Sequence, residues 1–393
     1  MERNHQGRNR KIAVIAPHSY DCGSDAFTVR MNMSIDFDAR RWERVKTDSA
    51  KWWAGELKRP LIQMVMKGRD PGRKEPSVPS YGFAARYPDD VAPEQIADRW
   101  EYDLSRRYFL GDAYPVEWLN FGAGVMAAML GCGLFADDNT VWFKPPRALA
   151  LDEVELKFDP ENKWFKRIAA VAEAAGQRLA GQAQIGMTDL GGTLDILSSF
   201  RPSEALLTDL IDAPETVEKL VWQTHALWRQ YFELFDQILR KYNIGWTCWT
   251  SLFSQQPYYM FQCDFCYMIG PEMFERFVKK DLAASCKWMK HGFYHLDGIG
   301  ELPHLDSILA IPELKGVQWI PGAGKPDAGY WPEVITKIRK AGKLVQFFGT
   351  MESFDALAEK TGSVEGVCLI CQGFFPRSRE KELEKFLLKY GAL

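Results

Sequence analysis

Short apolar segments alternate with longer segments of helical spacing through most of this sequence. The short apolar segments lie at residues 140–143, 182–187, 245–249, 293–297, 316–320, 344–348 and 367–371. Neighbouring parallel strands need a crossover that is long enough to hold a helix, so this alternation predicts parallel βαβ units. With a further apolar run at residues 59–66, the count is about eight strands. We therefore predict an α/β fold, a (β/α)8 TIM barrel with an amino-terminal extension, rather than an open doubly wound sheet.

The helices of this prediction follow from apolar spacing and from proline at first-turn positions. They lie at residues 93–110, 165–179, 214–242, 271–289, 331–340, 353–359 and 380–390. Residues 68–90 are rich in proline and glycine and form a loop long enough to cover a site. We assign residues 1–50, which include an apolar run at 12–16 that suits a strand or a helix, to the extension. The predicted barrel domain covers residues 51–393.

Composition and charge exclude several classes of partner. A net charge of −3 with dispersed basic residues gives no electrostatic basis for binding nucleic acid or an anionic membrane surface. The polar start lacks the apolar run of a signal peptide, and no segment approaches the roughly 20 apolar residues of a membrane span. We expect a cytoplasmic protein. Its eight cysteines are then expected to be thiols or metal ligands rather than disulfides.

The segment Phe293-Tyr-His-Leu-Asp-Gly298 carries the strongest chemical signal. His295 and Asp297 alternate along one predicted strand, so their side chains point to the same face. An imidazole and a carboxylate on the inner face of a barrel strand are half of a zinc site. The alternative is a histidine whose hydrogen bond to an aspartate merely satisfies a polar barrel mouth.

A thiolate at the end of another strand would complete such a site. Cys371 ends the predicted strand at 367–371, and Cys263 follows a strand-like stretch and precedes the next helix. A zinc with three protein ligands keeps an open coordination position for substrate. The alternative for Cys371 is a buried, inert thiol, which is also our interpretation of Cys368.

Other residues at predicted strand ends are candidates for substrate chemistry. Asp189 and Asp264 each follow a strand, where the carboxylate serves as an acid-base group or substrate contact; Asp189 equally suits a helix cap. Gln372 follows Cys371 and is a candidate substrate contact. Trp319 is a candidate wall of an apolar pocket, although such a ring equally suits an ordinary core.

Several segments resemble the uroporphyrinogen decarboxylase superfamily, and most closely its zinc-dependent corrinoid methyltransferases. The run Cys263-Asp-Phe-Cys-Tyr-Met-Ile-Gly-Pro-Glu-Met-Phe-Glu-Arg-Phe277 resembles the acidic loop of that superfamily, which leads into a Pro-Glu-x-Phe helix. Tyr294-His-Leu-Asp-Gly298 resembles the strand that reads His-x-Cys-Gly in the methyltransferases. Val367-Cys-Leu-Ile-Cys371 resembles the strand that supplies their last zinc ligand. The likeness extends over roughly residues 160–390.

The resemblance implies zinc held by His295, by Asp297 in place of a cysteine, and by Cys371, with Cys263 as a possible replacement. It also implies transfer of a methyl group between a small organic substrate and a corrinoid. An oxygen ligand in place of thiolate favours an oxygen-containing substrate or a metal other than zinc. The corrinoid-binding signature Asp-x-His-x-x-Gly is not present, because Phe293 stands where its Asp would be. Any corrinoid is therefore expected on a separate protein.

Two alternatives remain open from the sequence. One is a metal-free decarboxylase or lyase of the same superfamily, in which Asp189 or Asp264 is the acid-base group. Tetrapyrrole decarboxylation itself is disfavoured, because only Lys67 and Arg69 stand in the region that holds the anionic substrate in those enzymes. The other is a barrel that binds a small ligand without catalysis.

Overall fold

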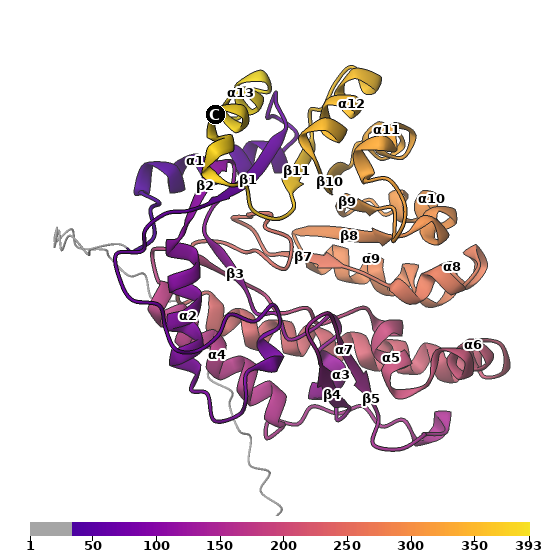
Figure 1. Cartoon of the computed structure of the whole chain (residues 1–393). Coiled ribbons are helices and arrows are strands. Elements are labelled where there is room, and N and C mark those ends of the chain that lie inside the picture. Colours follow the sequence, from indigo (N-terminus) through magenta and orange to yellow (C-terminus); the bar gives the residue numbers. More distant parts are fainter. Residues whose placement is uncertain (1–33) are drawn as a thin grey trace, which may run out of the picture. The chain divides into compact units, whose positions relative to one another are not determined.

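The computed structural model describes residues 34–393, which form one compact unit (Figure 1). The predicted strand or helix at 12–16 lies outside these residues. The helices are α1 (Ala39–Trp53), α2 (Pro93–Ser105), α3 (Met126–Met129), α4 (Lys163–Leu179), α5 (Thr193–Phe200), α6 (Ser203–Asp212), α7 (Pro214–Leu239), α8 (Pro271–Phe277), α9 (Lys279–Trp288), α10 (Leu305–Leu309), α11 (Pro332–Lys340), α12 (Met351–Thr361) and α13 (Glu380–Lys389). Within this part of the chain, no helix combines the length and apolar character needed to cross a membrane.

A seven-stranded sheet forms the centre of the fold. Its strand order is β2 (Arg107–Gly111), β1 (Leu61–Lys67), β11 (Val367–Cys371), β10 (Leu344–Gly349), β9 (Leu314–Ile320), β8 (His291–Asp297) and β7 (Tyr258–Phe261). Every neighbouring pair is parallel except β1 and β2. Helices α10 to α13 lie along the outer side of these strands (Figure 1). The predicted α/β class with a mainly parallel sheet is confirmed.

The structure does not show the closed barrel that the sequence predicts. In residues 34–393 the central sheet ends at β2 on one side and at β7 on the other. A short parallel pair, β3 (Val116–Trp118) and β6 (Gln184–Gly186), stands apart from the sheet. The antiparallel strand β2 pairs with the edge of β1 that another parallel strand would need. This pairing makes β2 one edge of the sheet.

Several predicted elements differ from those observed. The apolar segment at 245–249 is no strand; Trp246 forms an isolated bridge with Ser254, and Thr247 O accepts from Met187 N at 3.0 Å. The helix predicted at 93–110 ends at Ser105 and β2 follows. The helix predicted at 271–289 breaks at Val278, where φ is −120°, into α8 and α9. The strand predicted at 140–143 is β5 (Val141–Lys144), which pairs only with β4 (Gly133–Ala136).

Helix α1 packs on the central sheet through its last turn. Trp53 stacks on the imidazole of His291 at 4.3 Å, and its indole nitrogen donates to Phe253 O at 2.8 Å. Trp52 stacks on Phe293 at 6.1 Å. These contacts place α1 within the compact unit that begins at Ser34, so the expected domain boundary after residue 50 falls inside this helix.

Candidate functional site

Three side chains at the carboxyl ends of β7 and β8 converge on one point. His295 and Asp297 belong to β8, and Asp264 begins the short 3-10 helix η3 (Asp264–Met268) that follows β7. One ligand atom from each side chain lies within 4.8 Å of the other two. His295 Nε2 is 3.9 Å from Asp297 Oδ2. The carboxyl ends of neighbouring parallel strands meet at one edge of a sheet, which is why residues distant in sequence gather here.

A relay of amides fixes the orientation of the His295 ring. Its Nδ1 hydrogen-bonds to Gln318 Oε1, and Gln318 Nε2 donates to Gln346 Oε1. The three residues sit at matching positions of β8, β9 and β10, so their side chains share one face. The edge of Trp249 also packs on the ring at 5.0 Å. Because Gln318 Oε1 can only accept, Nδ1 donates this hydrogen bond, and Nε2 is the ring nitrogen that lies toward Asp297.

Two further aspartates lie beside this cluster. Burial raises the pKa of Asp189 to about 7, and the nearby charge of Asp264 adds to that rise. Asp189 follows β6 and accepts a hydrogen bond from Gly191 N at 2.9 Å. Burial and Asp264 likewise raise the pKa of Asp195 to about 7. Asp195 accepts from the backbone nitrogens of Asp264, at 3.1 Å, and Phe265, at 2.8 Å, and so holds the start of η3 in place.

A buried carboxyl group lies in the same neighbourhood. Glu301, in the 3-10 helix η4 (Ile299–His304), is 0% exposed, and burial raises its pKa to about 10. The Tyr294 hydroxyl donates to Glu301 Oε2 at 3.2 Å, while Oε1 has no partner among residues 34–393. This group is neutral at pH 7. The sequence did not point to Glu301 or Asp195, since each reads as an ordinary acidic residue in a first helical turn.

Like charges explain the need for a cation or protons at this site. Loss of contact with water raises the pKa of Asp264 even though part of this residue is exposed; His295 lowers that pKa and the Asp297 carboxylate raises it. Carboxylates this close together cannot all stay ionised unless a positive charge lies among them. A bound divalent metal would supply that charge.

Cys371 does not lie with His295. Register pairs of parallel strands share a face, and Gln346 pairs with Cys368, which puts Cys368 on the face that carries His295. Cys371 is three residues later, pairs with Gly349 and faces the opposite side. Burial raises its pKa to about 12, and its charged neighbours include Glu352 of α12. The structure thus separates the predicted cysteine ligand from the histidine.

The remaining predicted residues are dispersed. Cys263 is buried beside Cys266 and is not a member of the ligand cluster, and burial raises its pKa well above the usual thiol value. Trp319 pairs with Leu296, so it lies on the face opposite His295, where its ring meets Trp331 at 5.7 Å. Gln372 is exposed beyond β11. The tryptophan beside His295 is Trp249, for which the sequence offered no signal beyond its place in an aromatic segment.

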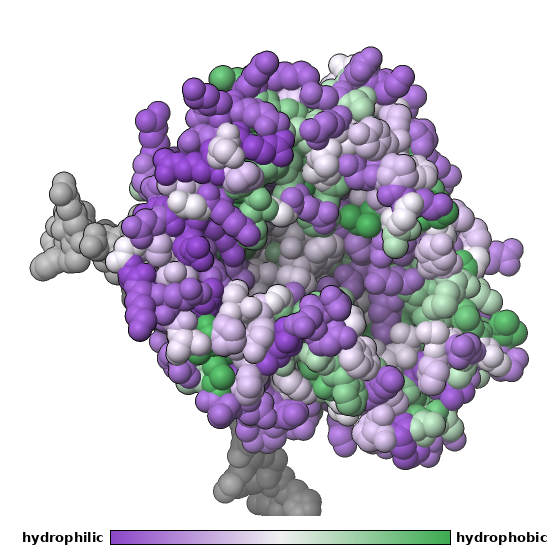
Figure 2. All heavy atoms as spheres, in the orientation of Figure 1, coloured by the Kyte–Doolittle hydropathy of each residue, from purple (hydrophilic) through white to green (hydrophobic). Residues whose placement is uncertain are grey.

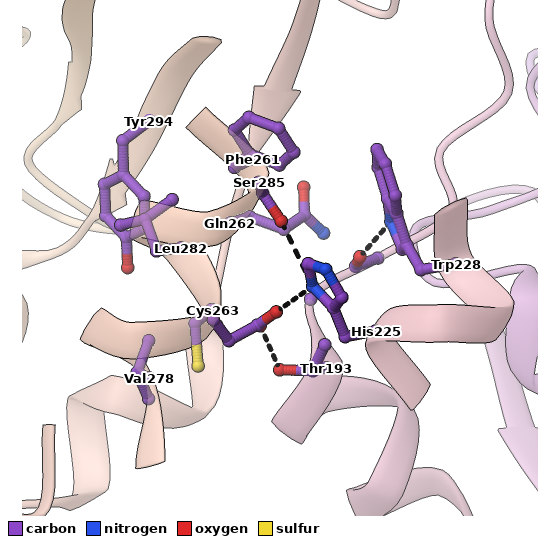
Figure 3. A pocket seen from close by; sticks show the side chains of 13 residues that line it. Thr193, His225, Trp228, Phe261, Gln262, Cys263, Val278, Leu282, Ser285 and Tyr294 are labelled. Atoms are coloured by element: carbon purple, nitrogen blue, oxygen red, sulfur yellow. Dashed lines mark hydrogen bonds and ion pairs between the residues drawn. The ribbon is translucent and has the colours of Figure 1, made fainter. Parts of the chain in front are cut away.

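A small cavity lies between α5, α7 and α9 (Figure 3). Its volume is about 20 Å³, room for one water molecule. Asp281 accepts from Thr193 Oγ1 at 2.7 Å and contacts His225 Nδ1 at 2.5 Å. Ser285 Oγ contacts that same nitrogen at 3.4 Å. A nucleophile and an orienting carboxylate would need different ring nitrogens, so this cluster ties three helices together and is not a catalytic triad.

Comparison with known proteins gives a fold and no family. No protein-family model matches the chain, and no curated protein matches it in sequence. Its fold is similar to that of a solved structure, a methyltransferase from Methanosarcina mazei, with a TM-score of 0.56 over 88% of this chain and 98% of that chain. The two sequences are 13% identical, so the likeness concerns the fold alone.

Proposed function

We propose that this chain is a metal-dependent methyltransferase that moves a methyl group between a small organic substrate and a corrinoid on a separate protein. The observation that carries the proposal is the convergence of Asp264, His295 and Asp297 at the carboxyl edge of the sheet. The resemblance of the sequence to corrinoid methyltransferases and the fold likeness support the reaction class.

The three residues fit a divalent metal. Zinc bonds to imidazole nitrogen and carboxylate oxygen at about 2.0–2.2 Å, which puts tetrahedral ligand atoms roughly 3.4 Å apart. The three ligand atoms lie within 4.8 Å of one another, so the widest separation would have to shorten by up to about 1.4 Å when a metal binds. The set contains one nitrogen and two oxygens and lacks thiolate. It therefore suits iron(II) and manganese(II) as well as zinc.

The surrounding residues prepare the site for that metal. When bound, the metal supplies Lewis-acid polarisation of a substrate group. Gln318 accepts from His295 Nδ1, which leaves Nε2 as the ring nitrogen that would bind the metal, and Asp195 holds the backbone from which Asp264 projects. Asp189, whose pKa lies at about 7, can hold or release a proton near the substrate at neutral pH. Two carboxylate ligands, with no thiolate, favour a substrate that reacts through oxygen.

We further propose that residues 51–393 are the catalytic domain, arranged as a (β/α)8 barrel around this site. The segments that would complete the ring are β3, β6 and residues 245–249. Leu119 N donates to Gly186 O at 3.2 Å, and Met187 N donates to Thr247 O at 3.0 Å, so these segments follow one another in hydrogen-bonded order. The corrinoid carrier is a separate protein under this proposal, because the chain has no Asp-x-His-x-x-Gly sequence.

Metal content tests the site directly. We expect about one divalent metal per chain in protein purified without chelator, measured by elemental mass spectrometry. His295→Ala and Asp264→Ala should lose it, whereas Cys371→Ala, on the other face of the sheet, should retain it. Gln318→Leu should weaken metal binding by about 10- to 100-fold, because it frees the histidine ring. A wild-type protein without metal would contradict the metal site.

A second candidate function, a metal-free lyase or decarboxylase, is favoured by one observation. Asp189 combines deep burial with a pKa of about 7, which suits a general acid or base. The two candidates differ in one assay. Methyl transfer to or from a corrinoid carrier that chelator abolishes supports the methyltransferase, whereas turnover that survives chelator supports the lyase.

A further inference from the structure

Two buried hydrogen-bond donors without partners lie beside the metal cluster. Gln346 is 0% exposed, and its Nε2 has no hydrogen-bond partner among residues 34–393. The buried indole nitrogen of Trp249 has none among the same residues. Leaving a buried donor unpaired costs free energy, and native structures rarely keep one. Two such donors next to one candidate site point to an acceptor that comes from outside the chain.

The relay that orients His295 also fixes the direction of the Gln346 amide. Gln318 Nε2 donates to Gln346 Oε1, so the oxygen of that amide is turned toward β9 and its nitrogen is turned away from β9. The reverse orientation would set two amide nitrogens against each other, and neither can accept. Nε2 of Gln346 therefore keeps its hydrogens for another acceptor.

Trp249 lies over the same face of the sheet. Its ring centre is 5.0 Å from that of His295 and 6.4 Å from that of Phe348. His295 belongs to β8 and Phe348 to β10, so the indole spans the strand between them. Phe348 is two residues beyond Gln346 and shares its face. Both donors thus lie on the face that carries His295.

One layer of side chains on this face is partly exposed although it belongs to central strands of the sheet. Its members, one from each of β8 to β11, are Asp297, Ile320, Phe348 and Ile370. The residues just before them point to the opposite face and are 0% exposed: Leu296, Trp319, Phe347 and Leu369. Solvent therefore reaches the layer from the His295 side, where a hollow with mostly apolar walls lies beside the metal cluster.

The chemistry of this hollow selects the kind of molecule that fits it. The two donors are neutral, and the layer has no basic side chain. Asp264 and Asp297 would balance the charge of a bound divalent metal, so a substrate carboxylate would gain no net attraction there. Ile320, Phe348 and Ile370 offer apolar contact. An uncharged molecule with an oxygen acceptor matches all of these features.

We propose that Gln346 and Trp249 determine substrate specificity by donating hydrogen bonds to an uncharged oxygen acceptor of a small organic molecule. The apolar part of that molecule packs against Phe348 and its two apolar neighbours in the layer. This inference rests on the proposed function, since it names the substrate class of the same site. A molecule without the acceptor leaves the buried donors unpaired, which is a strong basis for rejecting it.

Two probes of the same shape test the proposal. Acetophenone carries a carbonyl oxygen where α-methylstyrene carries a methylene group. We expect the chelator-treated chain to bind acetophenone about tenfold more tightly, as measured by ligand-observed NMR. Trp249→Phe and Gln346→Met should each remove most of this preference and leave the affinity for α-methylstyrene unchanged. Trp319→Phe is the matched control, because it removes another buried indole nitrogen that has no partner among residues 34–393, on the opposite face.

Three results would overturn the proposal. The first is that wild type binds both probes equally or binds neither, which would leave water as the partner of the donors. The second is that benzoate binds more tightly than acetophenone, which would contradict the uncharged class. The third is that Trp319→Phe loses the preference as fully as Trp249→Phe. Because the chelated chain is used, a preference for acetophenone in a protein that never holds metal would reject the methyltransferase and still support this ligand class.

Discussion

Asp189 shows how burial alone can set the acid-base behaviour of a residue. Its carboxyl group lies among apolar and polar protein atoms, with a hydrogen bond from Gly191 N that offsets only part of the cost of losing water. The same environment acts on Asp195 and, more strongly, on Glu301. In metal-free protein these groups take up protons at a pH where surface carboxylates are ionised.

This behaviour predicts a pH dependence of stability in metal-free protein. An unfolded aspartate titrates near 3.8, whereas folded Asp189 titrates at about 7. Between these values the folded state binds the extra proton, so the free energy of unfolding falls as pH rises. Asp189→Asn should make that fall shallower, as measured by urea unfolding at about pH 5 and about pH 8.

Asp137→Asn is the control for that experiment. Asp137 is exposed, and two backbone N–H groups, from Asn139 and Thr140, lower its pKa. The stability that the Asp137 carboxylate contributes is lost only when pH falls through that lowered pKa. Asp137→Asn should therefore show the same change in the free energy of unfolding between about pH 5 and about pH 8 as wild type. An Asp189→Asn protein with the wild-type slope would contradict the assigned role of burial.

At the residue scale, the sequence predicted those contacts that lie within one strand. His295 and Asp297 are two residues apart, and the strand period of two places them together. The third metal ligand could not be predicted in this way, because its position depends on contacts between different elements. Whether Cys371 or Cys368 shares the face of His295 is decided by the register of β10 against β11, which no local pattern encodes. Asp195 joins the site through hydrogen bonds to η3, a contact across 69 residues of sequence for Asp264.

At the element scale, helix α1 supports the strand that carries the candidate ligands. Trp53 is 8% exposed, stacks on His291 and donates to Phe253 O. His291 and His295 belong to the same strand, so the contact secures the amino-terminal end of β8. Burial also lowers the pKa of His291 to about 4, so the ring that meets Trp53 is neutral.

We therefore expect Trp53→Ala to destabilise the fold by about 3–5 kcal/mol, since it removes a large buried ring and leaves a cavity. Trp142→Ala is the comparison, because that ring is 38% exposed on the β4–β5 hairpin and should change the free energy of unfolding by no more than about 0.5 kcal/mol. Denaturant unfolding measures both. If Trp53→Ala changes the free energy of unfolding as little as Trp142→Ala, the packing of α1 does not stabilise the sheet.

Strands and helices were predictable where apolar spacing and packing agree. The predicted strands at 293–297, 316–320, 344–348 and 367–371 lie within β8, β9, β10 and β11. Residues 245–249 have the tryptophan and threonine content of a strand, yet the only bridge described for them is the one between Trp246 and Ser254, so composition alone did not decide their pairing. Residues 107–110 were predicted as the end of a helix, but they pair with the edge of β1 and form β2.

At the scale of the whole molecule, the alternation of strands and helices predicted the class of fold, and pairing at the sheet edges decided its closure. Figure 2 shows a recess near the middle of one face of the molecule. The metal cluster lies at the carboxyl ends of β7 and β8. A metal there would bind the folded chain, because Asp264 meets His295 and Asp297 only when β7 and β8 pair, and so it should stabilise the whole unit.

Thermal unfolding can measure this linkage for the metal. A metal present at about 100 times its dissociation constant adds about 2.7 kcal/mol to the free energy of unfolding. For a cooperative unit of this size, the entropy of unfolding converts that to a rise in Tm of about 4 °C. Chelator should reverse the rise, and His295→Ala should show none, whereas Cys371→Ala should behave as wild type. A rise of equal size in His295→Ala would place the metal elsewhere on the protein, because that chain lacks the imidazole on which the cluster depends.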